Sequence, residues 1–100
     1  MKNVIFNFEK IETMDDFYQT AVKELSLTDY FGNNLDALWD VLTGGIELPI
    51  NIEFENLTLD KLDRFEPLTN LFEDACVELG SDFQFEYYLK DEDLEFDLDD

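Results

Sequence analysis

The sequence contains no histidine, one cysteine and only six basic residues among 100. Without histidine, the chain lacks the side chain that most often acts as a general base or a metal ligand near neutral pH. With Cys76 alone, no disulfide can form within the chain, and this usage is typical of a reducing compartment. No run of about 18 apolar residues is present, so no transmembrane helix is expected. These absences together favour a cytoplasmic protein.

Acids greatly outnumber bases, by 26 to 6, and the formal net charge is −20. A surface of this sign repels nucleic acids and anionic membranes, so direct binding to either is not expected. It attracts basic proteins, at a rate that should fall as salt is added. Hydrophobic residues nevertheless make up 45% of the chain and aromatic residues 15%, which argues against disorder. A chain of this length can bury one core.

The spacing of apolar residues predicts an α/β fold. Alternation of apolar and polar residues indicates strands at 4–8, 48–54 and 83–89, and the presence of Ile5 between Val4 and Phe6 suggests that a second face of the sheet is at least partly covered. Helical spacing indicates helices over 13–25, 34–44 and 67–79, and more weakly around 59–62. Thr13 and Asn34 are the expected caps of the first two, and Pro67 fits the first turn of the later one. The resulting order is β-α-α-β-α-α-β. Strands separated by helices pair in parallel, so a small three-stranded parallel sheet with helices packed on it is predicted.

The last ten residues differ from the rest of the chain. Residues 91–100 include seven acids, whereas residues 1–90 carry the predicted strands and helices. We therefore predict one domain over 1–90, followed by an acidic, disordered tail. A weaker alternative is that Phe96 and its flanking leucines dock on a basic partner.

Two aspartates on the predicted second helix are the strongest candidates for function. Asp36 and Asp40 lie one turn apart, and no lysine or arginine occurs between Glu24 and Asp60. Like charges at this spacing destabilise a helix by about a few tenths of a kcal/mol. Asp40 also lies in the turn before Gly44, where the helix dipole disfavours an anion. A solvated polar face would account for Asp36 but not for Asp40, so the pair predicts a surface for a cationic partner.

Other side chains near this helix have two interpretations each. Tyr30 precedes a glycine turn and the acidic helix, and could either fill the core or act as an exposed binding anchor. Trp39 falls on the apolar stripe, which favours core packing. Asp74 belongs either to a solvated helix face or to a second acidic contact patch. Cys76 lies on an apolar stripe without basic neighbours, so we interpret it as a small buried hydrophobe.

Catalysis by these carboxylates is not expected. Paired acids can hydrolyse glycosides and clustered acids can hold Mg²⁺, but both chemistries need acids that converge on a concave site. Two aspartates on one exposed helix face do not converge. The sequence also lacks a nucleophile beside a base and a glycine-rich phosphate loop. We therefore predict no enzymatic activity, no cofactor and no metal site.

The run from Tyr30 to Gly44, YFGNNLDALWDVLTG, closely resembles the signature of the barstar family, which are intracellular ribonuclease inhibitors. The likeness extends more loosely over residues 1–90. It includes Gln19-Thr20 and Lys23-Glu24-Leu25 in the first helix, Leu48-Pro49 before the second strand, and Leu71-Phe72-Glu73-Asp74-Ala75 in the later helix.

The resemblance implies a small parallel sheet covered by helices, and a helix with its preceding loop that blocks the active site of a basic ribonuclease. It places Asp40 in the leading role, where the enzyme's cationic groups expect an RNA phosphate. Asp74 would be a flanking acidic contact. The partner-facing residues implied by the resemblance are Tyr30, Gly32, Asn34, Leu35, Asp36, Trp39, Asp40, Gly44 and Asp74.

The predicted function is thus an inhibitor of antitoxin or immunity type, a monomer when free, whose partner is a basic ribonuclease or a nuclease toxin domain. An alternative is an acidic mimic of nucleic acid that sequesters a basic DNA- or RNA-binding protein. In a mimic, the charge would act as a broad surface with no single dominant aspartate.

Overall fold

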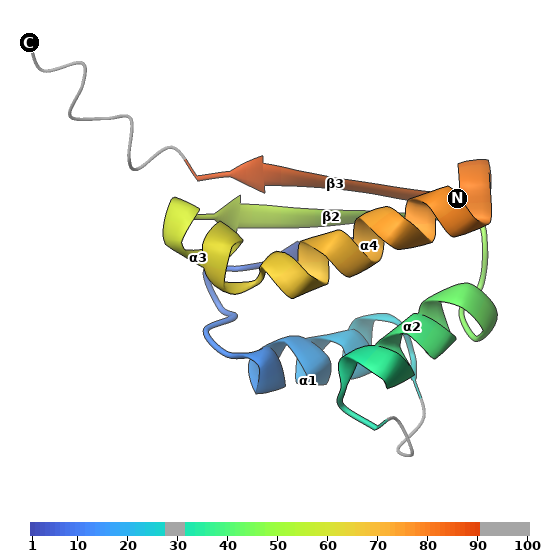
Figure 1. Cartoon of the computed structure of the whole chain (residues 1–100), viewed down its shortest axis with the longest axis horizontal. Helices are drawn as coiled ribbons and strands as arrows, with labels where there is room; N and C mark the ends of the chain where they lie inside the picture. Colours follow the sequence, from blue (N-terminus) through green and yellow to red (C-terminus); the bar gives the residue numbers. More distant parts are fainter. Residues whose placement is uncertain (28–31, 91–100) are drawn as a thin grey trace, which may run out of the picture.

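The computed structural model describes residues 1–27 and 32–90, and the predictions for Tyr30 and for the tail lie outside these ranges. The order of strands and helices confirms β-α-α-β-α-α-β, with one further 3₁₀ turn (η1) before the last strand (Figure 1). The elements are β1 (Lys2–Asn7), α1 (Met14–Glu24), α2 (Leu35–Gly44), β2 (Ile50–Leu57), α3 (Leu59–Arg64), α4 (Glu66–Leu79), η1 (Gly80–Asp82) and β3 (Phe83–Leu89).

The three strands form one parallel sheet in the order β1-β2-β3, which confirms the predicted fold class. Val4 pairs with Ile52, and Ile52 pairs with Phe85 on the other side. The helices α1, α2 and α4 lie on the same side of the sheet (Figure 1). Since β2 is central, its even-numbered apolar residues face the helices and form the middle of the core.

Phenylalanines from four elements fill that core. The Phe6 ring stacks on Phe17 of α1 at a centroid distance of 4.8 Å. Phe54 of β2 contacts Phe72 of α4 edge-on at 5.1 Å. All four side chains are fully buried. Aromatic pairs in these geometries add about 0.5–1.5 kcal/mol each beyond the burial of their area, so the cluster ties α1 and α4 to the sheet.

The other face of the sheet is open, which makes the prediction from Ile5 wrong. Ile5 is 48% exposed, and no helix among the described residues lies over this face of the sheet (Figure 1). The reason lies in the central strand, where Asn51, Glu53 and Glu55 alternate with the buried residues. Polar residues at every second position of β2 require water on that side. One aliphatic residue on the edge strand does not change this.

The helix ends follow the predicted capping residues. The Thr13 Oγ1 accepts from the Asp16 amide at 3.1 Å, and Asp16 Oδ2 accepts from the Thr13 amide at 3.2 Å, which completes a capping box. Pro67 lies in the first turn of α4, as predicted. Gly80 follows α4 with a φ of 68°, a conformation that glycine adopts without steric cost.

Three basic residues are held in ion pairs at the end of the sheet where β1 stops. Lys61 of α3 is buried, and its Nζ donates to the Phe8 carbonyl and to Glu12 Oε2, the latter at 2.9 Å. Arg64 pairs with Asp60 at 2.9 Å, and Lys90 pairs with Glu9 at 2.9 Å. Lys61 thus fastens the β1–α1 connection to α3.

Replacing Lys61 by methionine should destabilise the protein by about 1–3 kcal/mol, because the substitution leaves the buried Phe8 carbonyl without its donor. The measurement is the free energy of unfolding from urea denaturation. Lys2→Met is the matched control, since Lys2 is exposed and surface changes are usually within about 0.5 kcal/mol. Equal midpoints for the two variants would contradict this role of Lys61.

Candidate functional site

The helix α2 begins at an asparagine cap. The Asn34 Oδ1 accepts from the Ala37 amide at 2.8 Å, and its Nδ2 donates to the Gly32 carbonyl at 3.1 Å. Asn33, between Gly32 and Asn34, has a φ of 52°, which asparagine tolerates better than most residues. This local network fixes the direction in which the chain enters α2, and it places Gly32 and Asn34 on the exposed surface.

One side of α2 is committed to the core. Leu38 and Leu42 are fully buried, and Leu35 and Trp39 pack against the core while remaining partly exposed. The prediction that Trp39 packs with the core is confirmed, although part of its surface remains accessible. Partial exposure leaves Leu35 and Trp39 at the border between the core and the polar side of the helix, where they can contact another molecule.

The other side of α2 exposes both carboxylates. Asp36 and Asp40 are exposed, and residues at this spacing place their Cβ atoms about 5–6 Å apart. No hydrogen bond or ion pair between described residues uses either carboxylate. The last turn of α2 carries no basic residue, so Asp40 faces the negative end of the helix dipole without compensation.

Gly44 is the last residue of α2, and the packing around it does not require a glycine. A Cβ added to Gly44 would meet no atom within 4 Å. Glycine inside a helix is less stable than alanine by about 0.5–1 kcal/mol. The protein therefore keeps an open, side-chain-free surface at the end of the acidic helix.

Asp74 lies on the helix beside α2. The helices α2 and α4 pack against each other, and Asp74 is exposed on α4 next to the exposed Glu73. Among the described ion pairs, neither acid has a partner. The predicted residues within the described ranges thus lie on α2, on the residues just before it and on the neighbouring helix α4. No described ion pair includes Asp36, Asp40 or Asp74.

Comparison with known proteins identifies the family. A model described as "Barstar (barnase inhibitor)" matches residues 1–90. The chain belongs to the barstar family. It is 32% identical over 89 residues to "Putative ribonuclease inhibitor YrdF" of Bacillus subtilis (strain 168), a match that covers 84% of this chain and 96% of the relative. Membership supports a ribonuclease-inhibitor role, and the barstar family are inhibitors rather than enzymes.

The surroundings of Cys76 agree with a structural role in this barstar-family protein. Cys76 is partly buried against the core. Burial raises the pKa of its thiol, and the negative charge of Glu73 raises it further, whereas a backbone hydrogen bond with Phe85 acts in the opposite direction. A raised pKa leaves less thiolate near neutral pH, and the thiolate is the reactive form.

Within residues 1–27 and 32–90, no group of three or more metal-ligating side chains could hold an ion. None of the described helices has the length and apolarity needed to cross a membrane.

The acidic surface on the open face of the sheet was not predicted from the sequence. On the open face of the sheet, Glu53 of β2 pairs directly with Glu86 of β3, and Glu55 follows on the same face of β2. Like charges directly opposite each other destabilise a sheet. The sequence shows glutamates at alternate positions of both strands. Only the register of the sheet shows that Glu53 and Glu86 lie opposite each other and form an acidic surface.

Proposed function

We propose that this barstar-family protein inhibits a basic ribonuclease by placing α2 and its preceding loop in the enzyme's active site. In this mechanism Asp40 occupies the position of an RNA phosphate and Asp36 supports it. Gly32, Asn34, Leu35, Trp39 and Gly44 complete the contact surface, Asp74 adds a flanking acidic contact, and Tyr30 is a further contact from the preceding loop.

The single observation that carries the proposal is that Asp40 is exposed and forms no ion pair with any residue that the structure describes. In the free protein, Asp40 is repelled by Asp36 and by the helix dipole. In the complex, the cationic groups of a ribonuclease would replace that repulsion by attraction. A close pair at an effective dielectric near 20 is worth on the order of 4 kcal/mol before desolvation is subtracted.

The proposal requires that inhibitor and RNA exclude each other. The test uses the ribonuclease captured from the source organism's lysate and secreted fraction, with barnase as a reference enzyme. The apparent inhibition constant should rise linearly with RNA concentration, because both ligands need the same cleft. An apparent constant that is independent of RNA concentration would mean that the enzyme binds both together, and would overturn active-site blocking.

Replacing Gly44 by alanine should have opposite effects on stability and inhibition. The free protein should gain about 0.5–1 kcal/mol, because alanine is the better helix former and its Cβ meets nothing. Inhibition should weaken, because a partner seated on this surface meets the new methyl group. Urea denaturation and inhibition assays measure the two effects. Inhibition that is unchanged while stability rises would remove Gly44 from the interface.

An acidic nucleic-acid mimic remains the second candidate, and the open sheet face favours it. Glu53, Glu55 and Glu86 form an acidic surface on the side of the sheet that the helices leave open. A mimic would use this surface together with α2, and many substitutions would each have a small effect. An inhibitor that inserts α2 into an active site would instead depend on a few residues, above all Asp40.

The biological role that follows is that of an antitoxin or immunity protein. A cell that makes a ribonuclease, or that receives a nuclease toxin, must block it where RNA is present. We therefore propose a cytoplasmic inhibitor, monomeric when free, that binds its nuclease one to one and neither binds RNA itself nor associates with membranes.

A further inference from the structure

A groove of about 310 Å³ lies where α3, α4 and β3 meet. Leu59 and Leu62 of α3 and Tyr87 of β3 supply its apolar lining. The Lys90 amide donates to the Leu57 carbonyl at 2.8 Å, which holds the end of β3 beside the residues that enter α3 (Figure 1). Leu59 is 57% exposed and Tyr87 is 38% exposed, so another molecule can reach both. Exposed apolar surface with a polar rim is typical of an interaction site.

The helix α3 divides its side chains between two sides. Lys61 and Arg64 reach Glu12 in the connection between β1 and α1. Leu62 and Asp63 line the groove instead. The two basic residues of α3 are thus engaged away from the groove, whereas its acid Asp63 lies on it.

One face of α4 forms the opposite wall of the groove. The residues of this face recur at the i, i+3, i+4 and i+7 spacing, and they are Glu66, Thr69, Asn70 and Glu73. The hydroxyl of the buried Thr69 donates to the Glu66 carbonyl at 3.0 Å, so its proton is already used. Glu66 and Glu73 are seven residues apart, which is about 10 Å along the helix.

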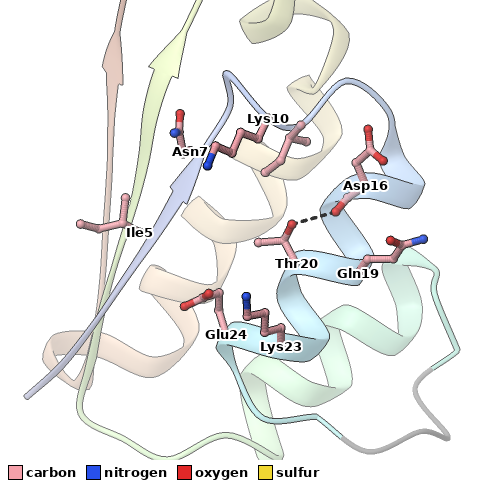
Figure 2. A pocket seen from close by; sticks show the side chains of 9 residues that line it. Ile5, Asn7, Lys10, Asp16, Gln19, Thr20, Lys23 and Glu24 are labelled. Atoms are coloured by element: carbon pink, nitrogen blue, oxygen red, sulfur yellow. Dashed lines mark hydrogen bonds between the residues drawn. The ribbon is translucent and has the colours of Figure 1, made fainter.

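The charge of the groove is of one sign. Asp63, Glu66 and Glu73 are exposed, and none of them takes part in a described ion pair. Among the described residues that line the groove there is no lysine or arginine. The larger pocket between β1 and α1 differs, because acids and lysines line it together (Figure 2). The occupant of the groove therefore combines an apolar part with positive charge.

Net charge decides between the possible occupants. A second copy of this chain also carries a charge of −20, so contact between two copies brings acids together. Charge likewise disfavours residues 91–100, of which seven are acids. A segment of another protein that carries apolar side chains flanked by lysine or arginine satisfies both the apolar lining and the acids of the groove.

The spacing of the acids on α4 favours a helical segment over a strand. A strand rises about 3.3 Å per residue, so two side chains about 10 Å apart are three residues apart and point to opposite faces. Helical residues that are seven apart span the same distance and lie on the same face. Only the helix can therefore direct two basic side chains to Glu66 and Glu73 together.

We propose that this groove binds a basic amphipathic helix of a second partner protein. The apolar stripe of that helix contacts Leu59, Leu62 and Tyr87, and basic side chains two turns apart pair with Glu66 and Glu73. This partner is distinct from the ribonuclease, because α4 packs against α2 on one side and against β3 on the other (Figure 1). The groove and α2 can therefore be occupied at the same time.

The probe for this site is a synthetic helical peptide of about 18 residues, with a leucine stripe and with lysines seven residues apart beside it. Titration into the full chain, followed by NMR, should shift the amides of Leu59, Leu62 and Tyr87 most. Leu59→Ser should weaken binding at least roughly tenfold, because the peptide loses an apolar contact. Val77→Ser is the matched control and should leave binding unchanged, since Val77 is an exposed apolar residue of α4 that does not line the groove.

Two double variants separate the groove from the general charge of the protein. Glu66→Gln with Glu73→Gln removes two acids of the groove, and Glu55→Gln with Glu86→Gln removes two acids of the open sheet face. Both variants lose the same net charge. The groove variant should weaken peptide binding at least roughly threefold more than the sheet variant, because only its acids pair with the lysines.

Three outcomes would overturn the proposal. Equal affinities of Leu59→Ser and Val77→Ser would mean that the peptide does not use the apolar lining. Equal losses in the two double variants would mean that the peptide responds only to overall charge. Shifts of Leu59 and Tyr87 on concentrating the protein alone would mean that the groove holds a second copy. None of these outcomes bears on ribonuclease inhibition, which Leu59→Ser should leave unchanged.

Discussion

Replacing Asp40 by asparagine should weaken ribonuclease inhibition by between about 30-fold and several thousand-fold. Truncating or neutralising one partner of a desolvated charge pair at an interface generally costs about 2–5 kcal/mol. The change is expected mainly in the dissociation rate, since the side chain acts after the surfaces have met. The measurement is the inhibition constant of the purified variant at fixed ionic strength.

The same substitution should leave the free protein slightly more stable. It removes a like-charge contact with Asp36 and an anion at the wrong end of the helix dipole, each worth about a few tenths of a kcal/mol. Loss of inhibition therefore cannot come from unfolding. The matched control is Asp63→Asn on α3, because Asp63 is exposed and takes part in no described ion pair. Equal losses in both variants would remove α2 from the mechanism.

Association with the ribonuclease should slow by about 100-fold or more between low and high salt. Electrostatically steered pairs associate at about 10⁸–10⁹ M⁻¹s⁻¹, whereas unsteered pairs reach about 10⁵–10⁶ M⁻¹s⁻¹. The net charge of −20 supplies the steering field, and raising ionic strength from about 0.01 to 1 M shortens its range from about 30 to 3 Å. Stopped-flow mixing over this range measures the rate constant.

The dissociation rate should change far less over the same range, because the contacts of α2 are already formed. A triple variant with Glu53, Glu55 and Glu86 changed to glutamine separates steering from contact. It should associate a few-fold more slowly with nearly unchanged dissociation. Faster dissociation of this variant would place the open sheet face inside the interface. An association rate that does not respond to salt would contradict steering altogether.

Local signals in the sequence were sufficient for most of the fold. Thr13 and Asn34 cap helices as predicted, and both use side-chain oxygens whose partners lie three residues away. The exposed position of Asp40 also followed from spacing, because Leu38 and Leu42 define the buried side of the same helix. Such features depend on neighbours within one or two turns, which the sequence displays directly.

Features that depend on distant neighbours could not be predicted. Lys61 reaches the Phe8 carbonyl from a position 53 residues later, and no local pattern indicates that contact. The exposure of Ile5 depends on the polar residues of β2, which its own strand does not reveal. The pocket lined by residues of β1 and α1 (Figure 2) likewise exists only once α1 has packed against the sheet. The resemblance already implied that Gly44 faces the partner, but the open space around it could not be predicted from the sequence.

The position of the bound nuclease is the most direct test of the central claim. Amide exchange of this protein, measured free and in complex with its ribonuclease, maps that position residue by residue. The mechanism predicts slowed exchange over residues 32–45 of the loop and α2, with a smaller effect around Asp74 on α4. Slowed exchange over the strands that carry Glu53 and Glu86, with α2 unchanged, would contradict it.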